Sequence, residues 1–345
     1  MTLIKKAMLD TNFPLLIAET ALNHEYEMNY FKRMIYELST KTKIKAIKTH
    51  MMIDLDTYMI KSHSLYDWLK HNKMTESQYK ELFIESKKHG LENIVLLDDY
   101  ASIDVALNFT NLIDAVEIHA VSINDIHMLR DIIKFDIPII VGIGGTRIDD
   151  ILYALEYLKG KDILLMYGYQ NFPTNYNYIN LNRIPKLRQL FDLPIGYADH
   201  CLFDDENNEM VTLGGYMTGC NIIEKHFTLD YGVKRIDYES AISIDMLNSL
   251  HNRMQILAKA KGTDSLILNN YENIYGKIGP MKKTFVASKD ILAGEEINFL
   301  NMSYKRTGEI NYLGQSQIDH IIGKIAKYDI KKDEIINLEK IYWEA

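Results

Sequence analysis

Cysteine is scarce in this chain, which has two, Cys201 and Cys220, among 345 residues. The two lie far apart in the sequence, and neither belongs to a Cys-x-x-Cys pair. The sequence therefore offers neither a disulfide framework nor a thiolate metal site, and we expect a protein of the reducing cytoplasm.

Long apolar runs and runs of basic residues are also missing. No window approaches the ~18 uncharged apolar residues that a membrane-spanning helix needs, and Met1–Lys6 leads into Asp10 without the apolar core of a signal peptide. Lysine and arginine total 39 against 47 aspartates and glutamates, a net charge of −8. We therefore expect neither a membrane span nor a nucleic-acid surface.

The remaining composition is that of an ordinary globular protein, with 47% apolar and 25% charged residues. That apolar fraction excludes a disordered chain, and the sequence has neither the glycine repeat of collagen nor sustained heptads. At roughly 150 residues per domain, the length predicts about two domains.

Short apolar segments alternate with amphipathic ones up to about residue 260. The expected strands are residues 15–18, 45–48, 93–97, 115–118, 138–141, 163–166, 194–197 and 221–224. The expected helices between them include residues 28–38, 76–88, 148–158 and 244–259. Such alternation implies parallel pairing, because each return needs a crossover helix. Eight such units close a (β/α)8 TIM barrel; an open doubly wound sheet is the alternative.

Polar side chains follow nearly every expected strand. In a TIM barrel the carboxyl ends of the strands hold the active site, so we expect a polar mouth there. The residues at these positions are Glu19, Lys48, Asp98, Glu117, His119, Gly144, Gly145, Gln170, Asp199, His200, Glu224, Lys225 and His226. Ordinary loop polarity is the alternative explanation of this pattern.

His200 and His226 end the seventh and eighth expected strands, which are neighbours in a closed barrel. Neutral imidazoles are common ligands of divalent first-row metals. Two of them leave coordination positions for water or substrate, which suits a Lewis-acid site better than a structural one. Two hydrogen-bonded structural histidines would give the same spacing.

Glu19 ends the first expected strand and can act as a general acid or base if it is partly desolvated; a solvated loop carboxylate is the alternative. Lys48 ends the second strand, where its ammonium can hold an anion. The Gly-rich segment 142–147 opens a helix whose first amides favour anions, although tight turns need glycine as well. These residues predict a metal-assisted or acid–base barrel enzyme acting on a polar, anionic substrate.

The pattern changes after residue 263. Residues 266–283 are expected to be a linker between a catalytic barrel at 1–265 and a small β-rich domain at 284–345. The small domain has β-like runs at 285–287 and 335–336 and a helical pattern at 315–322. At about 60 residues it is marginally stable alone, so we expect it to pack against something else.

Three barrel segments carry a family resemblance: Ile17–His24, Gly196–His200 and Glu224–Asp230. They resemble the sialic acid synthase family, which includes N-acetylneuraminate, legionaminate and pseudaminate synthases. The tail resembles that family's antifreeze-like (SAF) domain at residues 286–291, 293–295, 304–306 and 322–324. The match runs in one order over essentially the whole chain.

The resemblance implies condensation of phosphoenolpyruvate with an open-chain N-acetylated amino sugar, giving phosphate and a nonulosonic acid for surface glycan biosynthesis. It implies a divalent metal, Mn²⁺ or Mg²⁺, that polarises the sugar aldehyde, and a domain-swapped homodimer. The residues that match family roles are His200 and His226 as metal ligands, Glu19 as acid/base, Asp237 on the sugar, Lys48 and Gln170 near the donor, and Arg306, which the partner's C-terminal domain delivers.

Five residues of the implied donor pocket depart from the family pattern. Asp98 stands for a threonine, Glu117 for a lysine, Gln170 for an asparagine, and Ala120 and Ala198 for serines. Two unit charges ~4 Å apart at an effective dielectric of ~20 interact by about 4 kcal/mol, so glutamate in place of lysine would repel a phosphate. Either Glu117 is paired or protonated, or the phosphate binds at residues 144–147, or the donor is not phosphoenolpyruvate.

These departures leave two further functions open. A repurposed barrel could keep the metal and the sugar face and carry out metal-dependent aldol, lyase or epimerase chemistry without phosphoenolpyruvate. A sugar-binding or assembly subunit that lost catalysis is the third, although a decayed site has no reason to keep Glu19, His200 and His226.

Overall fold

The computed structural model describes residues 1–169, 171, 174–277 and 281–342. The chain divides into two compact units, Met1–Gly262 and Thr263–Ala345, and each is described by itself. None of the helices in the described ranges combines the length and the apolar character that crossing a bilayer requires.

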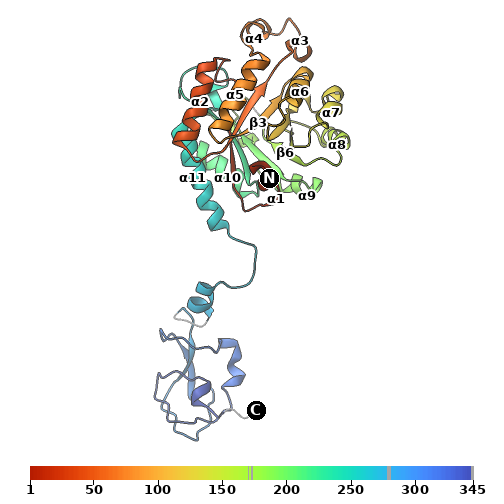
Figure 1. Ribbon diagram of the computed structural model, residues 1–345. Coiled ribbons are helices and arrows are strands. Elements are labelled where there is room, and N and C mark those ends of the chain that lie inside the picture. Colours follow the sequence, from red (N-terminus) through yellow and green to blue (C-terminus); the bar gives the residue numbers. More distant parts are fainter. Residues whose placement is uncertain (170, 172–173, 278–280, 343–345) are drawn as a thin grey trace. The chain divides into compact units, whose positions relative to one another are not determined.

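The first unit is a closed barrel of eight parallel strands (Figure 1). Its strands are β1 (Leu15–Glu19), β2 (Ala46–Met51), β3 (Glu92–Leu97), β4 (Ala115–Ile118), β5 (Ile139–Gly142), β6 (Ile163–Tyr167), β7 (Ile195–Asp199) and β8 (Ile222–Thr228). Each strand pairs with the next, and β8 returns to β1, where His226 lies opposite Glu19. The predicted TIM barrel is confirmed. The open doubly wound sheet is wrong, because an open sheet has no pairing between its first and last strands.

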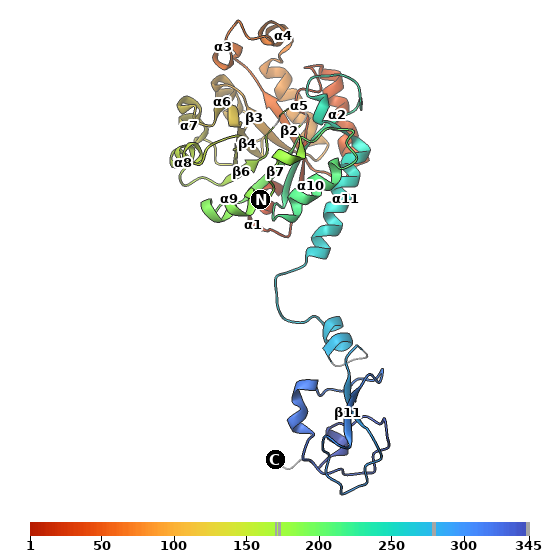
Figure 2. The same cartoon turned by 180° about the vertical axis from the view of Figure 1, so that it is seen from behind.

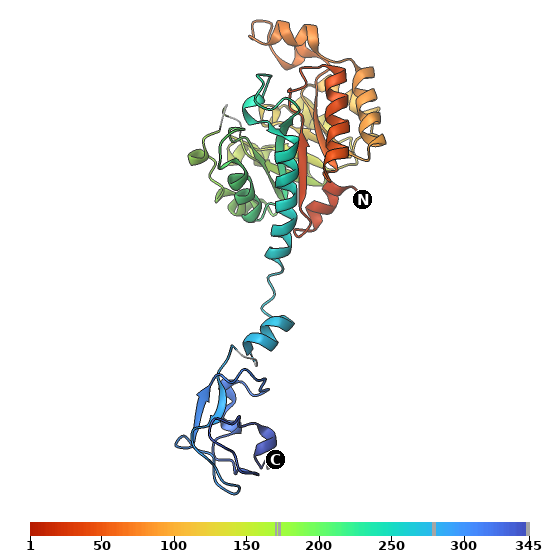
Figure 3. The same cartoon turned by 90° about the vertical axis from the view of Figure 1, so that its left-hand side faces the viewer.

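Helices surround this barrel on the outside (Figures 1 and 2). They are α2 (Met28–Lys41), α5 (Glu76–Lys88), α6 (Tyr100–Leu107), α7 (Ile126–Ile132), α8 (Ile148–Tyr157), α9 (Arg183–Phe191), α10 (Asn208–Met217) and α11 (Ile244–Lys261). The short helices α3 (Leu55–Tyr58) and α4 (Tyr66–Asn72) lie instead beyond the carboxyl ends of the strands, at the top of Figure 1. In Figure 3, α2 (red) and α5 (orange) run side by side over the barrel wall. The short strand β9 (Ile242–Ser243) pairs with the end of β8.

Several predicted elements are confirmed, and the differences lie at strand ends. Helix α5 has the predicted bounds, with Thr75 and Gln78 forming a reciprocal capping box at its start. Strands β2 and β8 continue beyond the apolar runs that predicted them, to Met51 and Thr228. The apolar run is shorter than the strand in both cases, because the strand continues with polar side chains that face into the barrel.

Alternate residues of the strands build two separate cores. One set points into the barrel and packs around Ile4 and Ala7 of helix α1 (Leu3–Leu9): Leu15, Ile17, Ala46, Ile94, Ala115, Ile140, Leu164, Met166, Ala198 and Ile222. The other set packs outward against the helices, in the larger core. Helix α1 therefore closes the amino-terminal end of the barrel with apolar side chains.

The second unit is small and has little regular structure. Strand β10 (Thr284–Ala287) pairs antiparallel with β11 (Met302–Lys305), and its buried core is built largely of isoleucines around Phe285. Residues 335–336 contribute one isolated bridge, from Ile335 to Val286, to this sheet. The helical pattern at 315–322 is a 3-10 segment over Gln315–His320 with a non-helical Gln317 inside it.

Candidate active site

A pocket opens at the carboxyl ends of the barrel strands. Its described lining residues are Glu19, Leu22, Lys48, His50, Met52, Tyr58, Met59, Leu65, Leu69, Asp98, Glu117, His119, Ala120, Gly142, Gly144, Met166, Gly168, Ala198, His200, Glu224, His226 and Asp237. Most of the polar strand-end residues predicted from the sequence are therefore brought together in one place.

The two-residue period of a strand explains which side chains reach this pocket. Inward-facing apolar residues in the lower barrel are followed two positions later by inward-facing polar ones, as in Ile17 and Glu19 or Ile222 and Glu224. Lys48 follows Ala46 in the same way. The polarity of the barrel interior thus changes along each strand, from an apolar base to a charged mouth.

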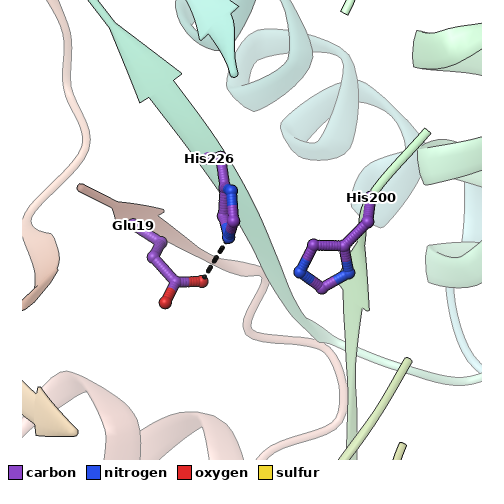
Figure 4. Close-up of side chains that lie close together, drawn as sticks. All are labelled: Glu19, His200 and His226. Atoms are coloured by element: carbon purple, nitrogen blue, oxygen red, sulfur yellow. Dashed lines mark ion pairs between the residues drawn. The ribbon is translucent and has the colours of Figure 1, made fainter. Parts of the chain in front are cut away.

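Glu19, His200 and His226 form a compact group of possible metal ligands (Figure 4). One ligand atom from each residue lies within 4.8 Å of the others. The Nε2 atom of His226 is 3.1 Å from Glu19 Oε2, and the two imidazole rings lie 4.8 Å apart and nearly perpendicular. His226 is thus hydrogen-bonded through Nε2 to Glu19, whereas its Nδ1 and that of His200 have no hydrogen-bond partner among the described residues.

The charge state of this group suits a divalent cation. Burial, and then the neighbouring His226, lower the pKa of His200 to about 3, so its imidazole is neutral. Although burial raises the pKa of Glu19, Lys48 and His226 hold it well below its usual range. Among the described residues, the Nδ1 atoms of His200 and His226 have no hydrogen-bond partner. The neutral imidazole of His200, the ring of His226 and an ionised carboxylate are a donor set that fits a first-row divalent metal.

Lys48 is almost fully buried and lies among three carboxyl groups. Its Nζ is 2.9 Å from both oxygens of Glu224, 2.8 Å from Glu117 Oε2 and 3.3 Å from Glu19 Oε1. Burial alone would lower the pKa of Lys48, but Glu117, Glu19 and Glu224 hold it well above its usual value. The ammonium is therefore charged. Glu117, which could be paired or protonated according to its sequence, lies in an ion pair with Lys48.

His50 is a site residue that the sequence reasoning missed. Its Nε2 is 3.2 Å from Glu19 Oε1 and its Nδ1 is 3.4 Å from Asp98 Oδ1. Burial lowers the pKa of His50, but Asp98 and Glu19 raise it well above the usual value, so the ring is an imidazolium. The signal that could have found it is its position two residues after Lys48, on the same face of β2.

The positions of Asp199 and Lys225 in the sequence predict that they lie at the mouth of the barrel, but their side chains do not line the pocket. Their neighbours His200 and His226 point inward, and these two point outward and form an ion pair between β7 and β8 that is closed to solvent. Asp199 also accepts hydrogen bonds from Tyr197 (2.7 Å) and from Thr212 of α10 (2.8 Å). The pair therefore holds the two histidine-bearing strands together from behind.

The remaining predicted residues lie in three different situations. Asp237 lines the pocket from the loop after β8, with a left-handed φ of 63°, and Leu22 N–H donates to its Oδ2 at 3.2 Å. Gln170 lies outside the described residues. Arg306 belongs to the second unit, where its guanidinium lies 3.6 Å from the sulfur of Met281.

The Gly-rich segment at 142–147 has a packing reason for two of its glycines. A Cβ on Gly144 would lie 1.9 Å from the carbonyl oxygen of Gly168, and one on Gly142 would lie 2.8 Å from the amide of Ala120. Arg147 is mostly exposed and pairs with Asp149 at 3.7 Å. The close approach of neighbouring backbone segments therefore accounts for these two glycines.

Taken together, the closed barrel and the charged mouth define a (β/α)8 protein of enzyme type with a candidate metal site at the strand ends. The chain belongs to the NeuB family, whose model matches residues 29–265. The resemblance seen in the sequence is thereby confirmed for the barrel.

Similar proteins match along most of the chain. An uncharacterized protein of Methanocaldococcus jannaschii is 28% identical over 335 residues, covering 95% of this chain and 93% of its own. The N,N'-diacetyllegionaminic acid synthase of Campylobacter jejuni is 27% identical over 340 residues, covering 93% and 98%. The crystal structure of an N-acetylneuraminic acid (sialic acid) synthetase from Leptospira borgpetersenii aligns with a TM-score of 0.69 at 23% identity, covering 76% of this chain and 90% of that one.

Proposed function

We propose that this protein is a nonulosonic acid synthase. It joins the methylene carbon of phosphoenolpyruvate to the aldehyde carbon of an open-chain N-acetylated amino sugar. Water adds at the former enol carbon and inorganic phosphate leaves. The observation that carries the proposal is the Glu19, His200 and His226 group at the mouth of a NeuB-family barrel.

The metal in this proposal is a divalent ion, Mn²⁺ or Mg²⁺, bound by His200 and His226. Held there, such an ion would supply Lewis-acid polarisation of the sugar aldehyde. The low pKa of His200, about 3, leaves its nitrogens free of added protons at neutral pH. The ionised Glu19 carboxylate lies 3.1 Å from His226 and can also reach the ion.

The chain's own residues bind the substrates and handle protons. Glu19 is the acid/base group, because its carboxylate is buried, ionised and hydrogen-bonded to two imidazoles. Lys48 keeps its charge in the pocket and faces the donor. Asp237 faces the sugar from the opposite loop, fixed by the amide of Leu22. Gln170 and Arg306 complete the substrate contacts in this proposal.

We extend the proposal to the second unit. Residues 284–345 are an SAF domain behind a linker at 266–283, and Arg306 reaches the active site of the partner in a domain-swapped homodimer. The test mixes R306A with H226A protein after mild unfolding. Activity recovered in the mixture, beyond either variant alone, supports a shared site; none recovered contradicts it.

The product class places the enzyme in carbohydrate biosynthesis, as a source of acidic sugars for surface polysaccharide. Cys201 and Cys220 are buried and unpaired, which agrees with a reducing compartment such as the cytoplasm. Fractionation of the native source followed by detection of the chain tests this part of the proposal.

The central experiment is phosphate release from phosphoenolpyruvate with Mn²⁺ and a panel of N-acetylated mannosamine-like sugars. Turnover with one of them, giving a nonulosonic acid by mass spectrometry, is the expected result. His226→Ala is expected to lose bound Mn²⁺ and activity together, whereas His127→Ala, on the exposed side of α7, keeps both. Absence of phosphate release with every sugar would sink the proposal.

A further inference from the structure

The donor side of the pocket has little positive charge to offer an anion. Among its described lining residues, Lys48 is the one lysine, arginine is absent, and the His50 imidazolium is the second cation. The same lining holds five carboxyl groups, and four of them surround these two cations: Glu19, Asp98, Glu117 and Glu224. Phosphoenolpyruvate carries a phosphate and a carboxylate, so its binding must change the charge balance of these groups.

Lys48 is already fully engaged by carboxyl groups of the protein. An ammonium has three protons to donate, and four carboxyl oxygens from Glu19, Glu117 and Glu224 lie within 3.3 Å of its Nζ. An incoming anion can therefore pair with Lys48 only if one of these carboxylates ends its ion pair with the ammonium.

Glu117 is the carboxyl group held least firmly. Its Oε2 lies 2.8 Å from Lys48 Nζ, but it has no hydrogen bond of good geometry within the described part of the chain, although the side chain is 2% exposed. Glu224 instead holds Lys48 with both oxygens. A proton on Glu117 Oε2 would therefore break no existing hydrogen bond.

We propose that Glu117 takes up one proton when the anionic donor binds, so that the neutral acid releases Lys48 to the donor. The proton comes from solvent and forms an O–H bond on a Glu117 carboxylate oxygen, which can then donate a hydrogen bond to the anion. No other bond is made or broken. The inference rests on the proposed function, because it takes phosphoenolpyruvate to be the donor.

Two carboxyl groups beside Lys48 have a raised pKa, and the contacts with Lys48 distinguish them. Burial and then Glu19 raise the pKa of Glu224 well above its usual value, but Glu224 holds Lys48 with both oxygens. Burial also raises the pKa of Glu117, Lys48 opposes that rise, and Glu19 raises it further. The other groups that face it are Lys48 and His50 on β2, Glu19 on β1, Asp98 after β3, His119 after β4, and Glu224 on β8. A doubly charged phosphate adds to the repulsion already exerted by Glu19 and favours the protonated form.

Calorimetry with phosphoenolpyruvate tests this coupling on the Mn²⁺-loaded full-length protein. Titrations are made at about pH 8, where a phosphate monoester with a second pKa of about 6 is fully ionised. Binding heats in two buffers of different ionisation enthalpy give the number of protons taken up. We expect the wild type to take up about one proton on binding. Because a bound proton is then needed for tight binding, the Kd should rise about tenfold per pH unit above the pKa of Glu117 in the unbound protein.

Glu117→Gln is the informative variant, because it keeps the shape and removes the charge. It is expected to take up no proton and to bind phosphoenolpyruvate at least about tenfold more tightly at about pH 8, a difference of about 1.4 kcal/mol. Glu156→Gln, an exposed glutamate on α8, should behave like the wild type. The pH dependence of the wild-type Kd gives a second measurement that needs no variant.

The outcomes separate the inference from the function. Turnover with phosphoenolpyruvate but no proton uptake, or equal uptake by wild type and Glu117→Gln, overturns the inference and leaves the synthase intact. No phosphoenolpyruvate binding by either protein, together with no phosphate release, overturns the synthase and the inference with it.

Discussion

The two halves of the pocket are built on opposite electrostatic rules. On one side, His200 is neutral, and the Nδ1 atoms of His200 and His226 have no hydrogen-bond partner in the described residues. On the other, Lys48 is charged and enclosed by the carboxyl groups of Glu117, Glu224 and Glu19. The first half has free ligand atoms ready for a cation, whereas the second is already balanced within the protein and must rearrange to take an anion.

Glu19 joins the two halves, since it contacts Lys48, His50 and His226 at 3.1 to 3.3 Å. A change on either side therefore alters the charge that this carboxylate experiences. Removing one group from each side, or a residue that supports them from behind, tests whether the two sides differ in this way.

The largest effect is expected on the histidine side. His200→Ala removes one of two imidazole ligands, and since a Lewis-acid metal contributes several kcal/mol to catalysis, kcat should fall about 1,000-fold or more. Mn²⁺ affinity by equilibrium dialysis should fall with it, while His71→Ala on the exposed face of α4 changes neither. Retained activity at full metal saturation would show that the two halves do not differ in this way.

On the lysine side, removing the Lys48 ammonium should mainly lower the free energy of unfolding. Lys48→Met leaves three buried carboxyl groups without their ammonium, and breaking a buried ion pair typically costs about 3–5 kcal/mol. Urea unfolding monitors the loss. Lys32→Met is the matched control, because the Lys32 ammonium pairs with Glu81 on the surface, where such pairs contribute about 0–1 kcal/mol. Equal losses in both variants would contradict a specially balanced lysine side.

A buried histidine beside the pocket gives a test by pH. Burial, and then His50, lower the pKa of His24 from 6.5 to about 3 in the folded chain. Between these values the unfolded state binds more protons, so stability falls as the pH falls below about 6.5, by about 2 kcal/mol at about pH 5.

His24→Asn keeps an acceptor for the Tyr26 amide, which donates to His24 Nδ1 at 2.9 Å. The variant should lose about 2 kcal/mol less than the wild type between about pH 7 and pH 5. Urea unfolding at both pH values gives the difference. An unchanged pH slope would show that His24 is not held neutral by the fold.

The smallest expected effect concerns the support behind the histidines. Thr212→Val removes the hydroxyl that donates to Asp199 at 2.8 Å and keeps the shape of the side chain. A hydrogen bond to a charged group contributes about 1.5–3 kcal/mol, so a loss of about 1.5 kcal/mol in unfolding free energy is expected. Mn²⁺ affinity should fall slightly in the same variant. Unchanged stability would mean that the Asp199–Lys225 pair does not need α10.

Much of this arrangement could be predicted from the sequence, because it depends on local periodicity. The eight apolar segments predict the barrel. Glu19, Lys48, His200 and His226 each follow or end one of these segments, which predicts that they lie together at one mouth of the barrel. The two-residue period also separates His200 from Asp199 and Lys225 from His226. Applied to β2, the same rule would have found His50, which the apolar-run criterion left outside the strand.

Other features depend on distances between strands that are far apart in the sequence. The contact of Lys48 with Glu117 and Glu224 joins β2, β4 and β8 across the barrel, and no local pattern indicates which carboxyl group will take the ammonium. The bond between Asp237 and the amide of Leu22 spans 215 positions. Such pairings follow from the closure of the barrel and the size of its interior, which the sequence does not display.

Helix α1 has a consequence for traffic through the barrel. Its Ile4 and Ala7 stop the amino-terminal end with apolar side chains that exclude water and ions. Because the barrel is closed at this end, its interior opens only at the carboxyl ends of the strands. Donor, sugar, phosphate and acidic product must therefore all pass through that one opening. A leaving anion must part from Lys48, which is 2% exposed, before it passes the loops around that opening.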